Sequence, residues 1–226
     1  PQRVSTVSRA VTLAGLDQLR TLALAVSAVE MFKDLPPDKV SMVSFWSHSV
    51  FCGLLARELA SVSRVLHCER LFVAGLLHDI GRLLIYIRVP EHAAEIHRRV
   101  AEGGGERCAV ERAVLGFDHA EAGAALLASW GLPPALQEAV ACHHAPERAE
   151  SGRIEAALLQ IANEATHTLE GEEEGDRSYY DPYGPMLRAA DADGLESDDA
   201  RRLPREAFAM CRLDPGEVAP AMRRAA

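Results

Sequence analysis

Residues 74–81 read AGLLHDIG, an apolar run that ends in an adjacent histidine and aspartate. The run predicts a buried helix over residues 69–80, with Gly81 as its C-terminal cap. Neighbouring side chains in the middle of a helix diverge by about 100°, but at a helix end His78 and Asp79 can both turn toward one ion. A neutral imidazole is the commonest metal ligand, and a carboxylate beside it supplies negative charge. The stretch therefore predicts a metal-type polar site.

Further histidines occupy positions from which they can reach the same site. His48 lies on an apolar helix face, His119 lies in the first turn of a helix, and His143 and His144 stand directly before a proline break. A lone histidine on an apolar face is ordinarily a core residue. Several such positions within about a hundred residues, together with the His-Asp pair, favour a shared site.

The composition favours packed helices. Of the 226 residues, 48% are hydrophobic and only 5% are aromatic, with abundant alanine and leucine. No apolar run approaches the roughly 20 residues of a membrane span, and the start does not read as a signal peptide, so we expect a cytoplasmic protein with no membrane partner. The net charge of −9 argues against nucleic-acid binding, which needs a basic face.

The cysteines indicate a reducing compartment. They are odd in number, widely scattered and free of any Cys-x-x-Cys spacing, which argues against a disulfide framework and a zinc finger. The five are Cys52, Cys68, Cys108, Cys142 and Cys211.

Helix-capping residues, glycines and prolines divide the chain into helices and place it in the all-α class, as a compact helical bundle. We expect helices over residues 4–13, 17–32, 41–60, 69–80, 90–101, 118–130, 133–145 and 154–169, one or two turns at 111–115, and a short helix after 214–215. Residues 1–169 then form a helical core, 170–200 an acidic flexible insertion or linker, and 201–226 C-terminal helices that pack on the core. Because the chain opens on Pro1 without an initiator Met, we expect further N-terminal helices to be missing from this fragment.

The order of the histidines resembles the HD superfamily of metal-dependent phosphohydrolases. The stretches AGLLHDIG (74–81), GFDHAEAG (116–123), WGLP (130–133) and HHAP (143–146) resemble one branch, the HDOD domain (HD-related output domain) of bacterial signalling proteins. The resemblance covers nearly the whole chain and implies an all-α bundle of the HD type. It also implies a divalent ion, iron, manganese or zinc, held by His48, His78, Asp79, His119, His143 and His144.

Two departures from the family bear on activity. The position that matches the final aspartate ligand of catalytic HD enzymes is Asn163, whose amide can coordinate through oxygen but brings no charge. We expect weaker metal binding and poorer activation of water in consequence. After His144 the chain also lacks the Gly-Tyr-Pro loop of the cyclic-dinucleotide phosphodiesterases of the HD-GYP group.

Other polar residues are weaker candidates. Arg82, directly after the His-Asp motif, could contact a phosphate, as could Lys39. Glu111 could support His119, although a surface position is the ordinary expectation for a glutamate. We expect four other histidines on the surface: His67, His92, His97 and His167.

Three functions remain open from the sequence. The first, which we favour, is a bacterial signalling or regulatory HDOD module that keeps the His/Asp metal site without catalysis and contacts a signalling protein or a small nucleotide-like ligand. The second is a metal-dependent phosphohydrolase acting on a nucleotide, favoured by the retention of six expected side chains. The third is a domain that holds a metal mainly for stability.

Overall fold

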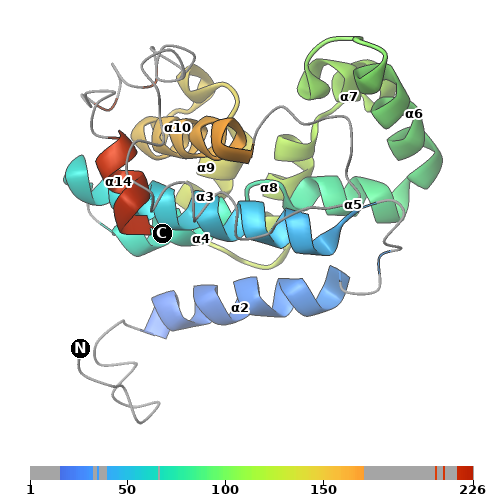
Figure 1. The fold of residues 1–226 in the computed structure, drawn as a ribbon. Coiled ribbons are helices and arrows are strands. Elements are labelled where there is room, and N and C mark those ends of the chain that lie inside the picture. The colour runs from blue at the N-terminus through green and yellow to red at the C-terminus, as the bar shows by residue number, and fades with distance from the viewer. Residues whose placement is uncertain are drawn as a thin grey trace.

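The computed structural model describes residues 16–32, 35, 40–65, 67–170, 207, 211 and 218–225. Within these ranges every regular element is helical, which confirms the all-α prediction (Figure 1). In chain order the elements are α2 (Leu16–Phe32), α3 (Met42–Val62), α4 (Cys68–Leu77), α5 (Ile80–Arg88), α6 (Pro90–Ala101), α7 (Arg107–Leu115), α8 (His119–Ser129), α9 (Pro134–Ala141), the 3₁₀ turn η1 (Pro146–Arg148), α10 (Arg153–Glu170) and α14 (Val218–Ala225).

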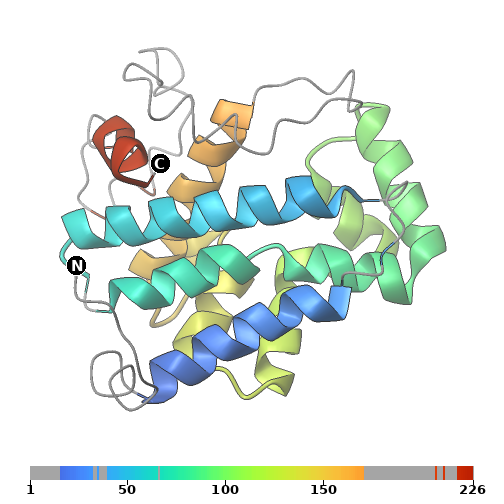
Figure 2. The same cartoon turned by 60° about the horizontal axis from the view of Figure 1, so that its bottom comes forward.

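Helices α3 and α4 form the centre of the bundle. They pack along each other, α2 lies against α4, and both α10 and α14 pack on α3 (Figures 1 and 2). The core between them is aliphatic, with leucines from α3, α4 and α10 fully buried: Leu55, Leu59, Leu77, Leu158 and Leu159. This burial fixes the relative position of the helices that carry the polar site. None of the helices in the described ranges is long and apolar enough to cross a membrane.

The break between α4 and α5 corrects one prediction. The expected helix over residues 69–80 ends at Leu77 instead, and a new helix starts at Ile80, so that His78 and Asp79 lie at the junction. Gly81 is not a cap, because it lies inside α5. A Cβ atom there would stand 1.9 Å from the carbonyl oxygen of His119, so the glycine is required by the close approach of the α5 and α8 backbones.

The start of α8 is fixed by a capping box at Asp118, the residue at which the sequence predicted this helix to begin. The Asp118 side chain accepts a hydrogen bond from the backbone N–H of Glu121 at 2.9 Å, and the backbone N–H of Asp118 donates to the Glu121 carboxylate at 3.4 Å. Arg112 also forms an ion pair with Asp118. These contacts place His119 at the first position of the helix.

The predicted starts and ends of most other helices lie close to those in the structure. Ser41 caps α3, and α6 begins at Pro90 as expected. Helix α7 is longer than the predicted turn at 111–115, and α5 beyond Gly81 was not predicted at all. The short helix expected after residues 214–215 is present as α14 (Val218–Ala225). The predictions for residues 4–13 and 171–200 lie outside the described residues.

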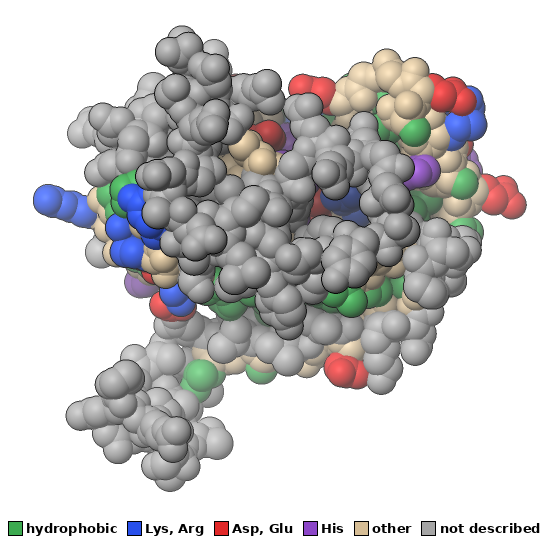
Figure 3. Space-filling model, in the orientation of Figure 1, with side chains coloured by type: hydrophobic (Ala, Val, Ile, Leu, Met, Phe, Trp, Pro, Cys, Tyr) green, Lys and Arg blue, Asp and Glu red, His purple; other side chains and the backbone are tan. Residues whose placement is uncertain are grey.

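Helices α6 and α7 pack on each other around a small apolar cluster of their own, made by Ile85, Ala93, Ile96 and Val110. In Figure 1 the two helices project at the right of the bundle. The outer face of α6 carries an ion-pair network in which Arg98 and Arg99 bind Glu95, and acidic and basic side chains adjoin at that edge in Figure 3. The pair is therefore a hairpin attached to the bundle through α5.

Candidate metal centre

The six predicted ligands come together at one place in the bundle. They arrive from α3, from the α4–α5 junction, from the first turn of α8 and from the turn after α9. Neighbouring imidazole rings lie with their centroids 5.3 Å (His48–His78), 5.1 Å (His78–His143), 5.7 Å (His119–His143) and 3.9 Å (His143–His144) apart. Segments almost a hundred residues apart in sequence therefore build one cluster.

Asp79 lies at the centre of the cluster. Its Oδ1 atom is 3.1 Å from His119 Nε2, 3.7 Å from His78 Nε2 and 4.0 Å from His143 Nε2. Its other oxygen accepts a hydrogen bond from Arg82 Nη1 at 2.6 Å. Burial opposes the charged form, but His78 and Arg82 together hold the pKa of Asp79 well below its ordinary value. Asp79 is therefore a carboxylate that faces the histidines with one oxygen.

Two histidines present unprotonated nitrogens to the cluster. The Nδ1 atoms of His78 and His143 each donate to a backbone carbonyl, of Gly75 and Val140, at 2.7 Å. Because a carbonyl can only accept, the Nε2 atoms carry the lone pairs; both are buried and have no hydrogen-bond partner among the described residues. Burial lowers the pKa of His78 to about 4 and that of His143 to about 3. Neutral imidazoles with orphaned, buried lone pairs are suited to hold a metal ion.

His119 is oriented by Glu111. The Oε2 atom of Glu111 accepts hydrogen bonds from the backbone N–H of His119 at 2.8 Å and from its Nδ1 at 2.6 Å, which directs Nε2 toward Asp79. Burial opposes a charge on His119, but Asp79 raises its pKa well above the ordinary value. The Nε2 atom also lies 3.0 Å from Nε2 of His144, whose pKa is lowered by burial to about 2. Asp79 Oδ1 and His144 Nε2 both face the Nε2 atom of His119. A metal cation bound at this point could contact the same three atoms.

The position of Glu111 corrects the expectation of a surface residue. Glu111 is only 2% exposed. Metal-binding histidines usually donate their second ring nitrogen to such a carboxylate, which fixes the tautomer. The signal was present in the sequence, because Glu111 follows Cys108 at a helical spacing of three and therefore shares its inward face.

The α3 side of the cluster contains the amide of Asn163. His48 Nε2 lies 3.0 Å from Asn163 Oδ1, and Asn163, on α10, is buried. His167 is one turn further along α10 and is exposed as predicted. Its ring nevertheless lies 4.4 Å from that of His48, centroid to centroid.

The donor atoms fall into two sets that share Asp79. One set is Asp79, His119, His143 and His144, and the other is His48, His78 and Asp79; within each, the donor atoms lie within 4.8 Å of one another. Imidazole nitrogens with one carboxylate suit iron, manganese or zinc, whereas calcium and magnesium prefer oxygen ligands. A divalent ion bound here would supply positive charge and Lewis acidity.

Arg82 was predicted as a possible phosphate contact, and the structure places it beside the cluster. One of its nitrogens binds Asp79, while its Nε atom is buried without a partner among the described residues. Lys39, the other candidate, lies outside the described residues.

The model of the HDOD domain matches residues 1–146. The chain belongs to the HDOD family. The matched residues of this HDOD domain include all six clustered histidine and aspartate residues, whereas Asn163 lies beyond them.

Similar proteins exist among curated sequences and solved structures. An uncharacterized protein of Treponema pallidum (strain Nichols) is 25% identical over 174 residues, which cover 76% of this chain and 33% of that protein, so the chain spans about a third of its length. A proposed phosphohydrolase of Shewanella amazonensis SB2B is 27% identical with a TM-score of 0.67, covering 99% of this chain and 77% of that one.

Two further structures are similar in fold. An HDOD domain protein of unknown function from Geobacter sulfurreducens is 22% identical with a TM-score of 0.60, and the match covers 100% of this chain and 76% of that one. A proposed signal-transduction protein of Marinobacter aquaeolei VT8 is 20% identical with a TM-score of 0.69, covering 99% and 45%. At this level of identity both matches show the HD-type helical fold alone.

Proposed function

We propose that this HDOD domain is a signal-transduction module that keeps a His/Asp metal site but hydrolyses phosphate esters very slowly or not at all. The observation that carries the proposal is the contact of Asn163 with His48, 3.0 Å between Oδ1 and Nε2. An amide stands where catalysis in this type of scaffold calls for a second carboxylate.

The charge of the site supports this proposal. The donor atoms that face the centre are imidazole nitrogens, one amide oxygen and the carboxylate of Asp79. A pair of divalent ions would therefore face a single negative charge, with Glu111 behind His119 as the next carboxylate. An ion held by His48, His78 and Asp79 would lack the anionic ligand needed to retain it firmly and to favour deprotonation of a water molecule.

The alternative is a metal-dependent phosphohydrolase acting on a nucleotide. It is favoured by the retention of all six ligands in one cluster and by the similarity to the Shewanella protein. The two functions differ in turnover, so a direct assay separates them.

The discriminating variant is Asn163→Asp. We expect elemental analysis of protein purified without chelators to find at least one iron, manganese or zinc ion, and we expect Asn163→Asp to bind a second ion more tightly, because it adds a carboxylate beside His48. Asn163→Ala, which removes the oxygen without adding charge, is the matched control and should show no such gain.

Parent and variants would be assayed against mononucleotides and cyclic dinucleotides with iron, manganese and magnesium. We expect no turnover by the parent at ordinary enzymatic rates, and weak metal-dependent hydrolysis by Asn163→Asp at most. Metal-dependent turnover by the parent on the order of 1 s⁻¹ or faster would establish the phosphohydrolase instead.

The remaining parts of the proposal concern context. We propose a bacterial, cytoplasmic protein whose partner is a signalling protein or a small nucleotide-like ligand and which binds neither nucleic acid nor membranes. The net charge of −9 supports the exclusion of nucleic acid.

A further inference from the structure

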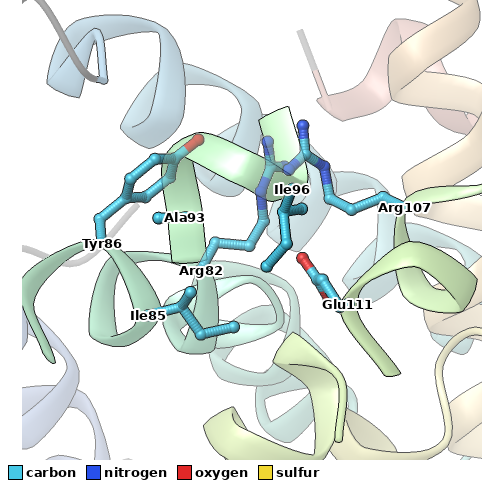
Figure 4. A pocket seen from close by; sticks show the side chains of 7 residues that line it. All are labelled: Arg82, Ile85, Tyr86, Ala93, Ile96, Arg107 and Glu111. Carbon is cyan, nitrogen blue, oxygen red and sulfur yellow. The ribbon is translucent and has the colours of Figure 1, made fainter. Parts of the chain in front are cut away.

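A cavity lies between α5, α6 and α7, on the outer side of the metal cluster. Two arginines, a tyrosine and a glutamate share its lining with apolar side chains: Arg82, Ile85, Tyr86, Ala93, Ile96, Arg107 and Glu111 (Figure 4). It adjoins the metal cluster through two of these residues, because Arg82 binds Asp79 and Glu111 binds His119.

The cavity contains two positive charges side by side. Figure 4 shows Arg82 from α5 and Arg107 from the start of α7 extending toward each other, with their guanidinium groups adjacent. Burial, and then the charge of Arg82, lower the pKa of Arg107, while Tyr86, Glu111 and Asp79 act in the opposite direction. Two adjacent guanidinium groups in a partly buried site repel each other unless an anion lies between them.

Glu111 is the carboxylate in the lining, and Asp79 adjoins the cavity through Arg82. Oε2 of Glu111 accepts its two hydrogen bonds from His119, and Asp79 offers Arg82 a single oxygen. Arg107 has no hydrogen bond or ion pair to any side chain in the described part of the protein. The Nε–H group of Arg82 is likewise buried and unpartnered there. Donors with unused capacity therefore outnumber the acceptors available to them.

The size and lining of the cavity limit what can fill it. Its interior volume is about 10 Å³, room for about one water molecule, and the larger empty space of about 210 Å³ includes open solvent at its mouth. A ligand can therefore place one charged group at the open mouth, against the two guanidinium groups, and a whole nucleotide cannot enter. Donors from two helices, with the Tyr86 hydroxyl close by, approach from different sides, which suits a tetrahedral oxyanion better than a planar carboxylate.

We propose that this cavity binds a phosphate group between Arg82 and Arg107, either as free inorganic phosphate or as the phosphate of a larger ligand whose remainder lies outside. The proposal rests on the proposed function in that it names the class of ligand that the module recognises. It needs no bound metal, because the two arginines and Tyr86 supply the donors.

The test is titration of inorganic phosphate into the full chain, followed by calorimetry or by ³¹P line broadening, once with chelator-treated and once with metal-loaded protein. We expect saturable binding in both forms. Arg107→Gln should weaken it about tenfold or more, because a charged bidentate donor is lost. Arg107→Lys should restore part of the affinity, since it keeps the charge and loses the fork. Arg148→Gln, which removes an exposed arginine, should bind like the parent.

Additional ligands identify the source of the phosphate. A nucleoside monophosphate that binds more tightly than phosphate, and still depends on Arg107, indicates a larger ligand. Equal affinity indicates free phosphate, and acetate should bind more weakly than either.

Absence of phosphate binding at millimolar concentration in folded protein would overturn the proposal. So would binding that Arg107→Gln leaves unchanged, or binding that appears only with metal and ignores Arg107. Metal content, measured on the same samples, reports separately on the proposed function. If the protein contains no metal but binds phosphate through Arg107, only the proposed metal site is contradicted. If the protein contains metal but binds no phosphate, only the proposed phosphate site is contradicted.

Discussion

Glu111 holds His119 at two points, through the backbone N–H and through Nδ1. A carboxylate so placed fixes the ring and its tautomer and makes the opposite nitrogen a better donor to a metal. It does so from α7, a helix that contributes no atom facing Asp79. We therefore expect the metal affinity of the site to depend on Glu111, which is not one of the predicted ligands.

Glu111→Gln tests this dependence. Glutamine keeps the size of the side chain but removes the charge behind His119, so we expect metal affinity to fall about 10- to 100-fold. Competition with a zinc-binding chromophore would measure it. Glu102→Gln, at the exposed C-terminal cap of α6, serves as the control, and equal affinities in the two variants would rule out this role for Glu111.

At the scale of the elements, the backbones of α5 and α8 approach closely at Gly81. Gly81→Ala would put a methyl group 1.9 Å from the carbonyl oxygen of His119 and 2.6 Å from the backbone nitrogen of Gly123. The helices would have to separate, and we expect a loss of about 1–3 kcal/mol of unfolding free energy, together with weaker metal binding through displacement of His119.

Gly123→Ala is the matched control on the facing helix. Its added methyl would meet its nearest neighbours at 3.4 Å, so we expect unfolding free energy within about 1 kcal/mol of the parent. Urea denaturation of both variants measures the difference. Equal stabilities would show that the two backbones are not held at this distance.

Gly81 also shows how far the sequence could predict these elements. Most helices could be predicted from their apolar periodicity, and so could the start of α8 at Asp118 and the clustered histidines. Each of these features depends on residues near in sequence or on a known motif. A glycine after an apolar run reads as a helix stop, and only the backbone of α8, some forty residues away, makes it a contact residue instead. Glu111 was placed at the surface for the same reason, since its partner lies on another helix.

Glu138 on α9 holds the loop that leads into α10. Its carboxylate accepts hydrogen bonds from the Ser151 hydroxyl and from the backbone N–H groups of Glu150, Ser151 and Gly152. These hydrogen bonds lower the pKa of Glu138 from its ordinary 4.5 to about 2, and the bond from the Ser151 hydroxyl has the largest effect. A group whose pKa is lower in the folded protein stabilises it above the unfolded pKa and loses that effect as the pH falls through the folded value.

Glu138→Gln should therefore cost about 1 kcal/mol at pH 7. The difference from the parent should shrink between pH 4.5 and about pH 2, as the wild-type carboxylate becomes protonated. Urea denaturation across this range measures it. Glu147→Gln, at an exposed neighbouring position, should show no such pH-dependent difference, and a constant deficit for Glu138→Gln at every pH would contradict the interpretation.

At the scale of the whole molecule, the His/Asp cluster joins helices that are distant in sequence. Its donors come from α3, the α4–α5 junction, α8 and the turn after α9. An ion bound only by the native protein stabilises it by about 2.7 kcal/mol at a hundred times its Kd. For a chain of this size that corresponds to a Tm difference of several degrees.

We expect chelator to lower the Tm of the metal-loaded protein by that amount. His78→Ala should melt near the chelated parent and respond little to chelator, whereas His92→Ala, an exposed control on α6, should behave like the parent. Differential scanning fluorimetry with and without chelator is sufficient. If His78→Ala and the parent lose the same number of degrees on chelation, His78 is not a ligand.

The α6–α7 hairpin, with its separate apolar cluster, has a consequence for hydrogen exchange. A unit with few contacts to the main core opens at lower free energy than the core does, so its backbone amides should exchange through local opening while those of α3 and α4 await global unfolding. The hairpin carries Arg107 and Glu111. Each opening would therefore withdraw a guanidinium group from the cavity and a carboxylate from His119 at the same moment, while the bundle beneath stays folded.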